Sequence, residues 1–461
     1  MLSLAMKKIL LLSILLFLPF SVAMPQKGIA AIMGELLDDE IFVEGEAAVV
    51  IYDLTAGKKV FGHRSGKMMR PASVMKVLTS VAALDTLGAG HVVSTTLSKI
   101  DGEGEYKLYV KGEMDPLFSE RDIIGLAASV PAGTVVDTLF ADCSFCDSLY
   151  WGPGWSWDDT PSAYQPYLSP LMLCGGTVRV VVSPSSEGES PEITCTPKSS
   201  FYTVVNEAEC GNQSLGKLTV TRDWLVDSNV IRISGNCVKE KKTDLNMYKS
   251  ADFFMAVLVE KLDSMGIKVN AVSFGRTPEK ALPIHTVRRS IKDIIEEALI
   301  ESNNLCAESL LYHMSAAVSR NPASIKRGCT VVESFVKNKL GHESGYNIAD
   351  GSGLSLYNYV TADMYMSLLR YAYSNPKIHS VIYPRLPLSG VSGTLKNRTK
   401  GTPAYRRVRA KTGTVTAVST LVGYADSKSG HTYAFVLLNN GNMSSKSVRK
   451  WQDKVCELLC R

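Results

Sequence analysis

The pattern of hydrophobic and polar positions divides the chain into two outer parts of mixed helix and strand and a middle part of short strands. Residues 46–53 form a nearly continuous apolar run, which is typical of a buried strand, and a glycine turn leads to a partner strand at 60–63. A helical pattern then runs from 73 to about 87 and ends at Gly88 and Gly90, because glycine commonly closes helices.

The middle of the chain, from about 96 to 280, has a different character. Short alternating segments such as 107–110 and 178–182 are separated by glycine, proline and serine, which indicates strands and turns. We therefore expect a β-rich insertion here, built as one or two small modules.

The last part of the chain returns to longer patterns. Helical periodicity is present at 290–313 and 325–339. We expect paired strands at 418–425 and 431–439, and a final helix from about 445 to 459.

The length of 461 residues exceeds what one hydrophobic core supports, so two or three domains are expected. We place an inserted region at 96–280. The segments 24–95 and 281–461 then form the two parts of one further domain.

The first residues are typical of an export signal rather than of a folded domain. Lys7 and Lys8 precede an apolar run at 9–20, and small residues follow up to Ala23. A retained membrane anchor is the alternative, but the run is shorter than the roughly 20 residues that a spanning helix needs. We therefore expect a signal peptide at 1–23, a periplasmic mature protein, and no transmembrane segment after cleavage.

Composition and charge exclude several classes of protein. The chain is 45% hydrophobic and 21% charged, which is ordinary for a globular protein. Its net charge of +5 is too small to indicate a nucleic-acid partner. No long charge run or low-complexity tract indicates a disordered tail.

Ten cysteines are present, and an even number in an exported chain indicates disulfides, because that compartment is oxidising. Cys143 and Cys146 have the spacing of a redox motif or of half a zinc site. No second pair with this spacing follows, so a local structural disulfide is the favoured interpretation. The spacing of the other eight cysteines leaves their pairing open.

Ser73 and Lys76 lie three residues apart at the start of the first strong helical pattern, so they share one helix face. A serine hydroxyl becomes nucleophilic when a base removes its proton, and lysine serves as that base when its pKa is lowered. The Ser73 N–H at a helix start is also free to bind a developing oxyanion. A Ser-x-x-Lys motif alone occurs by chance, and a helix cap beside a solvated lysine would explain it.

Two further motifs carry polar groups suited to a substrate. Ser302 and Asn304 interrupt an apolar helical pattern, and a break there would turn a hydroxyl and an amide toward a cleft. Lys411 and Thr412 supply a charge and a hydroxyl for a carboxylate, while Gly413 lets a substrate backbone approach a strand. A polar turn and an ordinary edge strand are the respective alternatives.

Ser-x-x-Lys, Ser-x-Asn and Lys-Thr-Gly in this order are the signature of penicillin-binding proteins and serine β-lactamases, which this chain resembles. From about residue 35 onward it is similar to one branch, the D-alanyl-D-alanine carboxypeptidases/endopeptidases of the low-molecular-mass class C penicillin-binding proteins. That branch has a long insertion between the first two motifs, as here. The segments that carry the similarity are Gly-Glu-Met-Asp-Pro at 112–116, Trp-Ser-Trp-Asp-Asp at 155–159, Asp-Gly-Ser-Gly-Leu-Ser at 350–355 and Ser-Gly-Thr-Leu at 392–395.

The resemblance implies an α+β fold: a serine β-lactamase/transpeptidase-like catalytic domain, with an antiparallel sheet and helices, and inserted β-rich domains. It implies a serine hydrolase that cuts D-alanyl bonds in peptidoglycan stems or cross-links, needs no metal or cofactor, and is inhibited by β-lactam antibiotics. Ser73 would be acylated, Lys76 would be its base, and Ser302 would relay a proton to the leaving amine.

The other motif residues would bind the substrate. By resemblance, Asn304 would hold the substrate amide, and Gly413 would allow its close approach. Lys411, Thr412 and Thr414 would hold the terminal D-alanine carboxylate, and the N–H groups of Ser73 and Thr414 would form the oxyanion hole.

Specificity is less defined. Leu356 stands where arginine is common in this branch, and that arginine helps to recognise the end of the peptide side chain. Asn303 stands where aspartate is common. By analogy Asp158 would meet a distal amino group of the substrate, with plain packing of the neighbouring tryptophans as the alternative. The sequence leaves carboxypeptidase and endopeptidase activity open.

Three other functions are alternatives to this interpretation. A β-lactamase shares the motifs, and Glu343 and Asn347 have the spacing of a deacylating base and its partner, but the long insertion argues against it. A catalytically inactive peptidoglycan-binding protein of the same fold would not need all three motifs intact. A Ser-His-Asp hydrolase is disfavoured because no Gly-x-Ser-x-Gly nucleophile elbow occurs.

Overall fold

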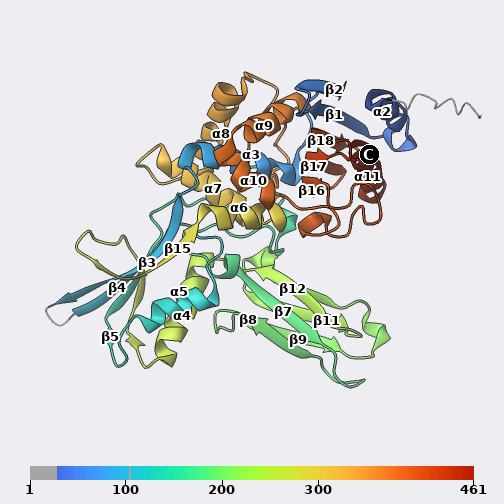
Figure 1. Cartoon of the computed structure of the whole chain (residues 1–461). Coiled ribbons are helices and arrows are strands. Elements are labelled where there is room, and N and C mark those ends of the chain that lie inside the picture. The colour runs from blue at the N-terminus through green and yellow to red at the C-terminus, as the bar shows by residue number, and fades with distance from the viewer. Residues whose placement is uncertain (1–27, 103–104) are drawn as a thin grey trace, which may run out of the picture.

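The computed structural model of the chain describes residues 28–102 and 105–461; the predicted signal peptide at 1–23 lies outside them. The upper body in Figure 1 is built on a five-stranded antiparallel sheet with the order β16-β17-β18-β1-β2. Both ends of the chain contribute to it, which confirms the strands predicted there. The strands are β1 (Glu46–Asp53), β2 (Lys58–His63), β16 (Val408–Val415), β17 (Val418–Asp426) and β18 (Thr432–Asn440).

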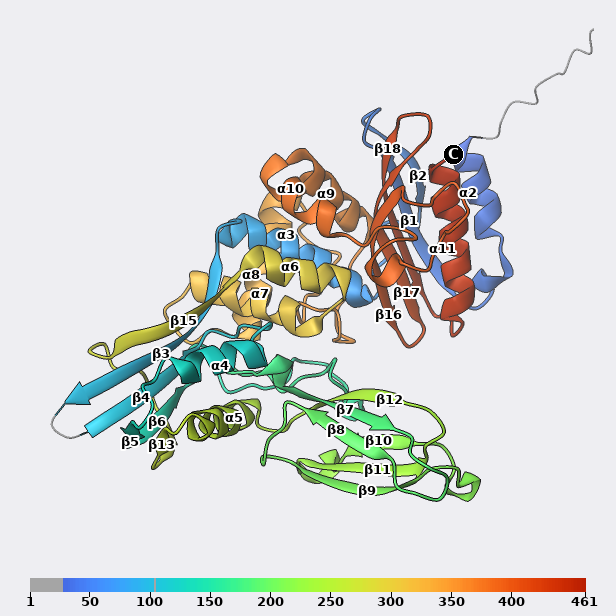
Figure 2. The same cartoon turned by 60° about the horizontal axis from the view of Figure 1, so that its bottom comes forward.

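Helices cover both faces of this sheet (Figure 2). On one face α2 (Ile29–Leu37) packs against the final helix α11 (Ser445–Leu459), so the two ends of the described chain lie side by side. The other face carries α3 (Met75–Leu87), α6 (Ile291–Ile300), α7 (Asn304–Ala317), α8 (Ile325–Leu340), α9 (Ala362–Ser374) and α10 (Pro376–Arg385).

Helix α3 lies at the centre of the helical layer. It contacts α6, α7, α8, α9 and α10, and every residue from Met75 to Leu84 is buried. A helix that is apolar nearly all round is stable only inside a protein. The sequence of α3 therefore places the Ser-x-x-Lys motif, at its first turn, in the interior between the helices and the sheet.

The helical pattern predicted at 290–313 is two helices, α6 and α7, with a break at 301–303. Ser302 has φ +63°, in the left-handed region that non-glycine residues rarely adopt. The side chain of Asn303 then caps α7 by accepting the Cys306 N–H at 3.2 Å. Ser302 thus lies in the break, as the sequence indicated, and Asn304 is the first residue of α7.

The middle of the chain contains a second five-stranded sheet, with the order β14-β6-β4-β3-β15. The strands are β3 (Val92–Gly102), β4 (Glu105–Gly112), β6 (Thr138–Asp142), β14 (Val272–Phe274) and β15 (Leu282–Ser290), and a short pair β5 (Val135–Val136) and β13 (Lys268–Val269) extends the region. Strands β3 and β15 pair antiparallel from Val92 opposite Ser290, so the chain enters and leaves this region side by side. The boundaries at 96 and 280 stay a prediction.

Two three-stranded sheets form the lobe at the lower right of Figure 1. They are β10-β11-β9 and β12-β7-β8, and their inward residues share one hydrophobic core with the second five-stranded sheet. Their strands are β7 (Thr177–Ser183), β8 (Glu192–Thr196), β9 (Thr203–Glu209), β10 (Thr219–Arg222), β11 (Val230–Asn236) and β12 (Lys241–Asn246).

The middle region is also partly helical, which the prediction of short strands missed. It contains α4 (Glu120–Ala128) and α5 (Ser250–Ser264). In α5 the buried residues Phe253, Phe254, Val257 and Leu258 recur at the helical spacing of three and four. Helix α5 packs against α4 and contributes to the core of the region.

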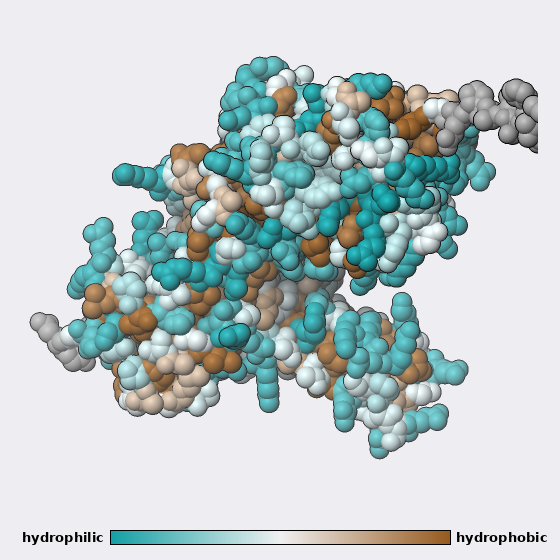
Figure 3. Space-filling model, viewed as in Figure 1, coloured by the Kyte–Doolittle hydropathy of each residue, from teal (hydrophilic) through white to brown (hydrophobic). Residues whose placement is uncertain are grey.

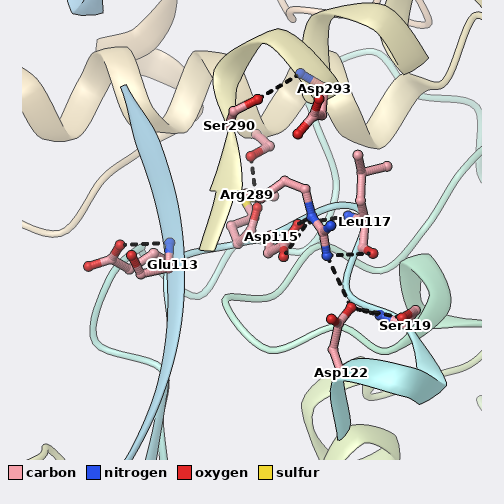
Figure 4. Close-up of polar contacts among 11 residues, drawn as sticks. Glu113, Asp115, Leu117, Ser119, Asp122, Arg289, Ser290 and Asp293 are labelled. Atoms are coloured by element: carbon pink, nitrogen blue, oxygen red, sulfur yellow. Dashed lines mark hydrogen bonds and ion pairs between the residues drawn. The ribbon is translucent and has the colours of Figure 1, made fainter. Parts of the chain in front are cut away.

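Arg289, near the end of β15, joins the second sheet to the segments beside it (Figure 4). Its guanidinium lies 3.4 Å from a carboxylate oxygen of the buried Asp115 and 3.0 Å from one of Asp122 on α4, and it donates to the Leu117 carbonyl. The Asp122 carboxylate in turn accepts the Ser119 N–H at the start of α4. One arginine therefore fixes a strand, a loop and a helix where the middle region meets the rest of the protein.

All ten cysteines are free thiols in this structure, so the disulfide predicted between Cys143 and Cys146 is not formed. Burial raises the pKa of Cys143 to about 11 and that of Cys146 further above its usual value. Because the thiolate is the species that forms disulfides, thiols buried in this way react slowly.

The surface is polar over most of the face in Figure 3, with apolar side chains scattered across it, and a notch separates the upper body from the lower right lobe. In the part of the chain that the structure describes, none of the helices has the length and hydropathy required to cross a bilayer.

Candidate active site

Ser73 and Lys76 meet as their spacing predicts. Ser73 lies in a 3-10 turn at Ala72–Val74 that leads into α3, and Lys76 Nζ is 2.9 Å from Ser73 Oγ. Lys76 is fully buried. Its Nζ also donates to Asn304 Oδ1 at 2.7 Å and to the Ser352 carbonyl at 2.8 Å.

These contacts determine how a neutral lysine would be oriented. A neutral amine has two N–H donors and one lone pair, and a carbonyl and an amide oxygen can only accept. The Asn304 amide is fixed because its Nδ2 donates to the Tyr164 carbonyl at 2.7 Å. With both N–H groups used by Asn304 and Ser352, the lone pair of Lys76 faces the Ser73 hydroxyl.

The electrostatics of the site favour this neutral form. Burial lowers the pKa of Lys76 to about 8, although the nearby Asp350 and Glu308 carboxylates oppose the shift. A lysine with this pKa is partly neutral near physiological pH and can accept the proton of the serine.

Ser302 and Lys411 form a second pair beside the first. Lys411 Nζ donates to Ser302 Oγ at 2.8 Å and to the Thr412 carbonyl at 2.9 Å. Lys411 is fully buried, and burial and then the charge of Lys76 lower its pKa well below the usual value. The Lys411 ammonium group therefore contacts the Ser302 hydroxyl, and it is not exposed to the solvent in the cleft.

Lys411, Thr412, Gly413 and Thr414 lie on β16, the strand at one edge of its sheet. At Gly413 a Cβ atom would lie 2.7 Å from the Pro71 carbonyl oxygen and 3.0 Å from the Ser73 nitrogen. Only glycine lets β16 approach the nucleophile turn this closely. Thr412 Oγ1 contacts Thr394 Oγ1 at 2.8 Å, and Thr414 is exposed at the rim.

A cleft of about 410 Å³ opens above these groups. It contains the expected Ser73, Ser302, Asn304 and Thr414, which come from sequence positions far apart. Its other lining residues are Ser156, Asp159, Tyr164, Gly353, Leu354, Leu356, Val415 and Thr416.

The segment at 350–355 supports the site in a way that the motifs alone did not indicate. Asp350 is fully buried and accepts five hydrogen bonds, from Trp155 Nε1, Asn358 Nδ2, the Gly353 and Ser355 N–H groups and the Ser352 hydroxyl. The Gly353 N–H and the Ser352 carbonyl belong to one peptide group. The carboxylate of Asp350 on one side and Lys76 on the other therefore polarise the same peptide.

Glu308 on α7 holds the other side of this turn. It is fully buried and accepts the N–H groups of Gly351 at 3.2 Å and Ser352 at 2.9 Å. Burial and then the Asp350 carboxylate raise the pKa of Glu308 to about 8. No sequence motif singled out Glu308, because its role depends on a contact between segments distant in sequence.

The structure places the residues considered for substrate specificity and for deacylation both inside and outside the cleft. Asp158 is exposed and does not line the cleft; its neighbour Asp159 does, and accepts a hydrogen bond of 2.7 Å from the Tyr164 hydroxyl. Leu356 lines the cleft at the position where arginine was expected. Glu343, the alternative deacylating base, is exposed and pairs with Lys337 outside the cleft lining.

Comparison with known proteins gives one consistent result. The model of the D-Ala-D-Ala carboxypeptidase 3 (S13) family matches residues 29–461. A D-alanyl-D-alanine carboxypeptidase from Actinomadura sp. (strain R39) is 30% identical over 435 residues, which cover 88% of this chain and 80% of that protein.

Solved structures share the fold. Penicillin-binding protein 4 (dacB) from Haemophilus influenzae superposes with a TM-score of 0.81 at 22% identity, covering 93% of this chain and 99% of that one. The structure of that protein complexed with a β-lactam superposes with a TM-score of 0.75 at 20% identity over the same shares of both chains.

Proposed function

This chain belongs to the D-Ala-D-Ala carboxypeptidase 3 (S13) family, and from that premise we propose that Ser73 is the residue acylated by D-alanyl peptides of peptidoglycan. The protein is a serine-type hydrolase of the D-Ala-D-Ala carboxypeptidase class. The observation that carries the assignment of Ser73 is its contact with Lys76, a fully buried amine whose lone pair has one free direction.

The first half of the reaction forms an ester. The Ser73 oxygen attacks the carbonyl carbon of the penultimate D-alanine while its proton passes to Lys76 Nζ. The Ser73 and Thr414 N–H groups stabilise the oxyanion that forms. When the C–N bond breaks, the leaving amine takes a proton from the Ser302 hydroxyl, which Lys411 Nζ, 2.8 Å away, replaces.

The second half consumes one water. Before this step the proton that Lys76 took from Ser73 passes by way of Ser302 to Lys411, so that Lys76 is again neutral and Lys411 regains the proton it gave up. The water then attacks the ester carbon and gives a proton to Lys76, which passes it to the leaving Ser73 oxygen, and the peptide departs as a carboxylic acid. Each turnover converts one peptide and one water into a shortened peptide and free D-alanine. The residues named above supply every proton transfer in this sequence.

The leaving group distinguishes two activities at the same site. With free D-alanine as the leaving group the protein is a carboxypeptidase, and with the side-chain amine of a second stem peptide it is an endopeptidase. The cleft is lined in part by Thr414 and Val415 of the edge strand β16. We propose that both activities use Ser73, and hydrolysis of a purified cross-linked muropeptide by the parent but not by Ser73→Ala tests this.

The first experiment concerns the nucleophile itself. Residues 24–461 are purified with and without Ser73→Ala and incubated with a fluorescent penicillin, since β-lactams acylate the serine that attacks D-alanyl bonds. Covalent label on the parent protein and none on the variant is the expected result. A folded parent that takes no label would reject the catalytic assignment and leave a peptidoglycan-binding protein. Label that is lost within seconds would favour a β-lactamase.

We further propose that the protein is exported to the periplasm and cleaved after Ala23, because its substrate lies outside the cytoplasm. The Lys7–Lys8 pair and the apolar run at 9–20 support this proposal. N-terminal sequencing of the protein recovered from a periplasmic extract tests it, with Met24 as the expected first residue.

A further inference from the structure

Arg449 is a positively charged residue beside the cleft, and it has no role in the mechanism proposed above. It is exposed on α11, and its Nη2 donates a hydrogen bond of 3.3 Å to Thr414 Oγ1. Thr414 lines the cleft together with Ser73 and Ser302. A guanidinium group therefore reaches the rim of the site at the end of the edge strand.

The helix beneath Arg449 is firmly held. Gln452 is fully buried, and its Nε2 donates to the carbonyl of Ser419, the residue paired with Thr414 in the sheet. Arg398 donates to the Arg449 carbonyl at 3.2 Å. Because residues three apart share a helix face, the anchoring of Gln452 holds the Arg449 side chain over this end of β16.

The other cations near the site are less available to an anion. Lys76 and Lys411 are fully buried, and burial lowers the pKa of both. Among the cleft-lining residues in the described part of the chain, Asp159 is the one with a charged side chain, and its charge is negative. A positive charge that pairs with a substrate carboxylate in the cleft must therefore come from a residue adjacent to the cleft-lining residues.

We propose that Arg449 binds the free C-terminal carboxylate of the scissile dipeptide, together with the Thr414 hydroxyl, and so selects peptides with a free carboxyl end. A guanidinium offers two parallel N–H donors that match the two oxygens of a carboxylate, and arginine stays charged at every working pH. The inference rests on the proposed function, because it places the substrate in the cleft above Ser73.

The test compares two peptides that differ only at the carboxyl end. Both end in D-Ala-D-Ala, one with a free carboxylate and one with a C-terminal amide. We expect Arg449→Ala to raise KM for the carboxylate peptide about tenfold, with little change in kcat, because it removes a charge-assisted contact with the carboxylate at an exposed site. The amide peptide should be hydrolysed by this variant as by the parent.

Two further variants separate charge from structure. Arg449→Lys keeps the positive charge and should retain part of the preference for the carboxylate peptide over the amide peptide. Lys450→Ala removes a neighbouring exposed charge of the same helix and should leave that preference unchanged. The preference of the parent for the carboxylate peptide should also decrease as salt is raised toward 1 M, because an exposed charge is screened.

The inference would be overturned if Arg449→Ala lost the same factor in kcat/KM on both peptides. It would also be overturned if this variant preferred the carboxylate peptide as strongly as the parent does. Penicillin at saturating concentration should still label Ser73 in Arg449→Ala to the same final extent as in the parent. A parent protein that takes no label rejects the proposed function instead, so the two failures are distinguishable.

Discussion

At the scale of single residues, the site depends on the partners that each polar atom has. Lys76 uses two fixed acceptors, Asn304 and Ser352, and this leaves one direction toward Ser73. Burial supplies the second condition, a lowered pKa, by removing water that would stabilise the ammonium. Geometry and burial together give Lys76 the two properties that the proposed base requires.

The pKa of Lys76 predicts how acylation depends on pH. Because the pKa is lowered to about 8, the neutral, active form increases as pH rises through that value. We expect the second-order rate of labelling by a fluorescent penicillin to rise about tenfold per pH unit below pH 8 and to level off above it. A rate that is independent of pH between 6 and 9 would contradict the role of Lys76 as base.

Gly413 predicts a steric limit on the site. In Gly413→Ala the new methyl group would lie 2.3 Å from Thr420 Oγ1 and 3.0 Å from the Ser73 nitrogen, so the strand must move away from the nucleophile. We expect a loss of roughly a hundredfold in the labelling rate, since displacements near 1 Å have that effect. Gly66→Ala, where nothing lies within 4 Å, is the control and should label at the parent rate.

At the scale of elements, the middle region supplies one wall of the cleft. Tyr164 lines the cleft, and its carbonyl fixes the Asn304 amide. The segment that carries it is tied to the end of β12 by Asn246, whose Nδ2 donates to the Thr160 hydroxyl and to the carbonyls of Ser162 and Gln165. A segment far from the motifs in sequence therefore positions the Asn304 amide, which we propose to be part of the catalytic site.

Asn246→Ala tests this connection. Asn246 is fully buried, so its removal leaves several polar groups without partners, at a cost of about 1–3 kcal/mol each. We expect the 160–165 segment to loosen, the penicillin labelling rate to fall several-fold, and the melting temperature to decrease. Asn270→Ala, an exposed position in the same region, is the control. A lowered melting temperature with an unchanged labelling rate would show that Asn246 is structural only.

At the scale of the whole molecule, the described residues form three hydrophobic cores, one of which lies between the first sheet and helices α2 and α11, and polar contacts join the other two. One core contains α3 and the helical layer, and the other contains the sheets of the middle region. Arg289 lies near their junction, where it pairs with the buried Asp115 and with Asp122. Because Asp115 is buried, loss of this arginine would leave an uncompensated charge.

Arg289→Met should therefore destabilise the protein strongly. Removing one partner of a buried pair costs about 3 kcal/mol, and urea denaturation should show this as an earlier transition of the middle region. Arg288→Met, at the exposed neighbouring position on β15, should change the transition by less than about 0.5 kcal/mol. Equal effects of the two substitutions would refute the role of the ion pairs.

The sequence by itself determined the features that local chemistry expresses. The strands β1, β2, β17 and β18 and the helices α3, α6, α7, α8 and α11 agree with the local patterns, and the break before α7 agrees with the polar residues that begin at Ser302. Helices α2, α9 and α10 were not predicted. The three motifs also contain the residue types that acyl transfer at a serine requires. These are a hydroxyl, an amine and an amide, and a glycine that allows close approach of the backbone. These features depend on neighbours a few residues away, so a linear pattern contains them.

Tertiary structure decided the rest. The Ser352 carbonyl that directs Lys76 is 276 positions away in the chain, and backbone carbonyls look alike in every sequence. Glu308, Tyr164 and Arg449 gain their places only when helices, loops and the edge strand meet, and the burial that raises the pKa of the Cys143 and Cys146 thiols also comes from the fold. Burial and long-range contact depend on the whole fold, and no short stretch of sequence determines them.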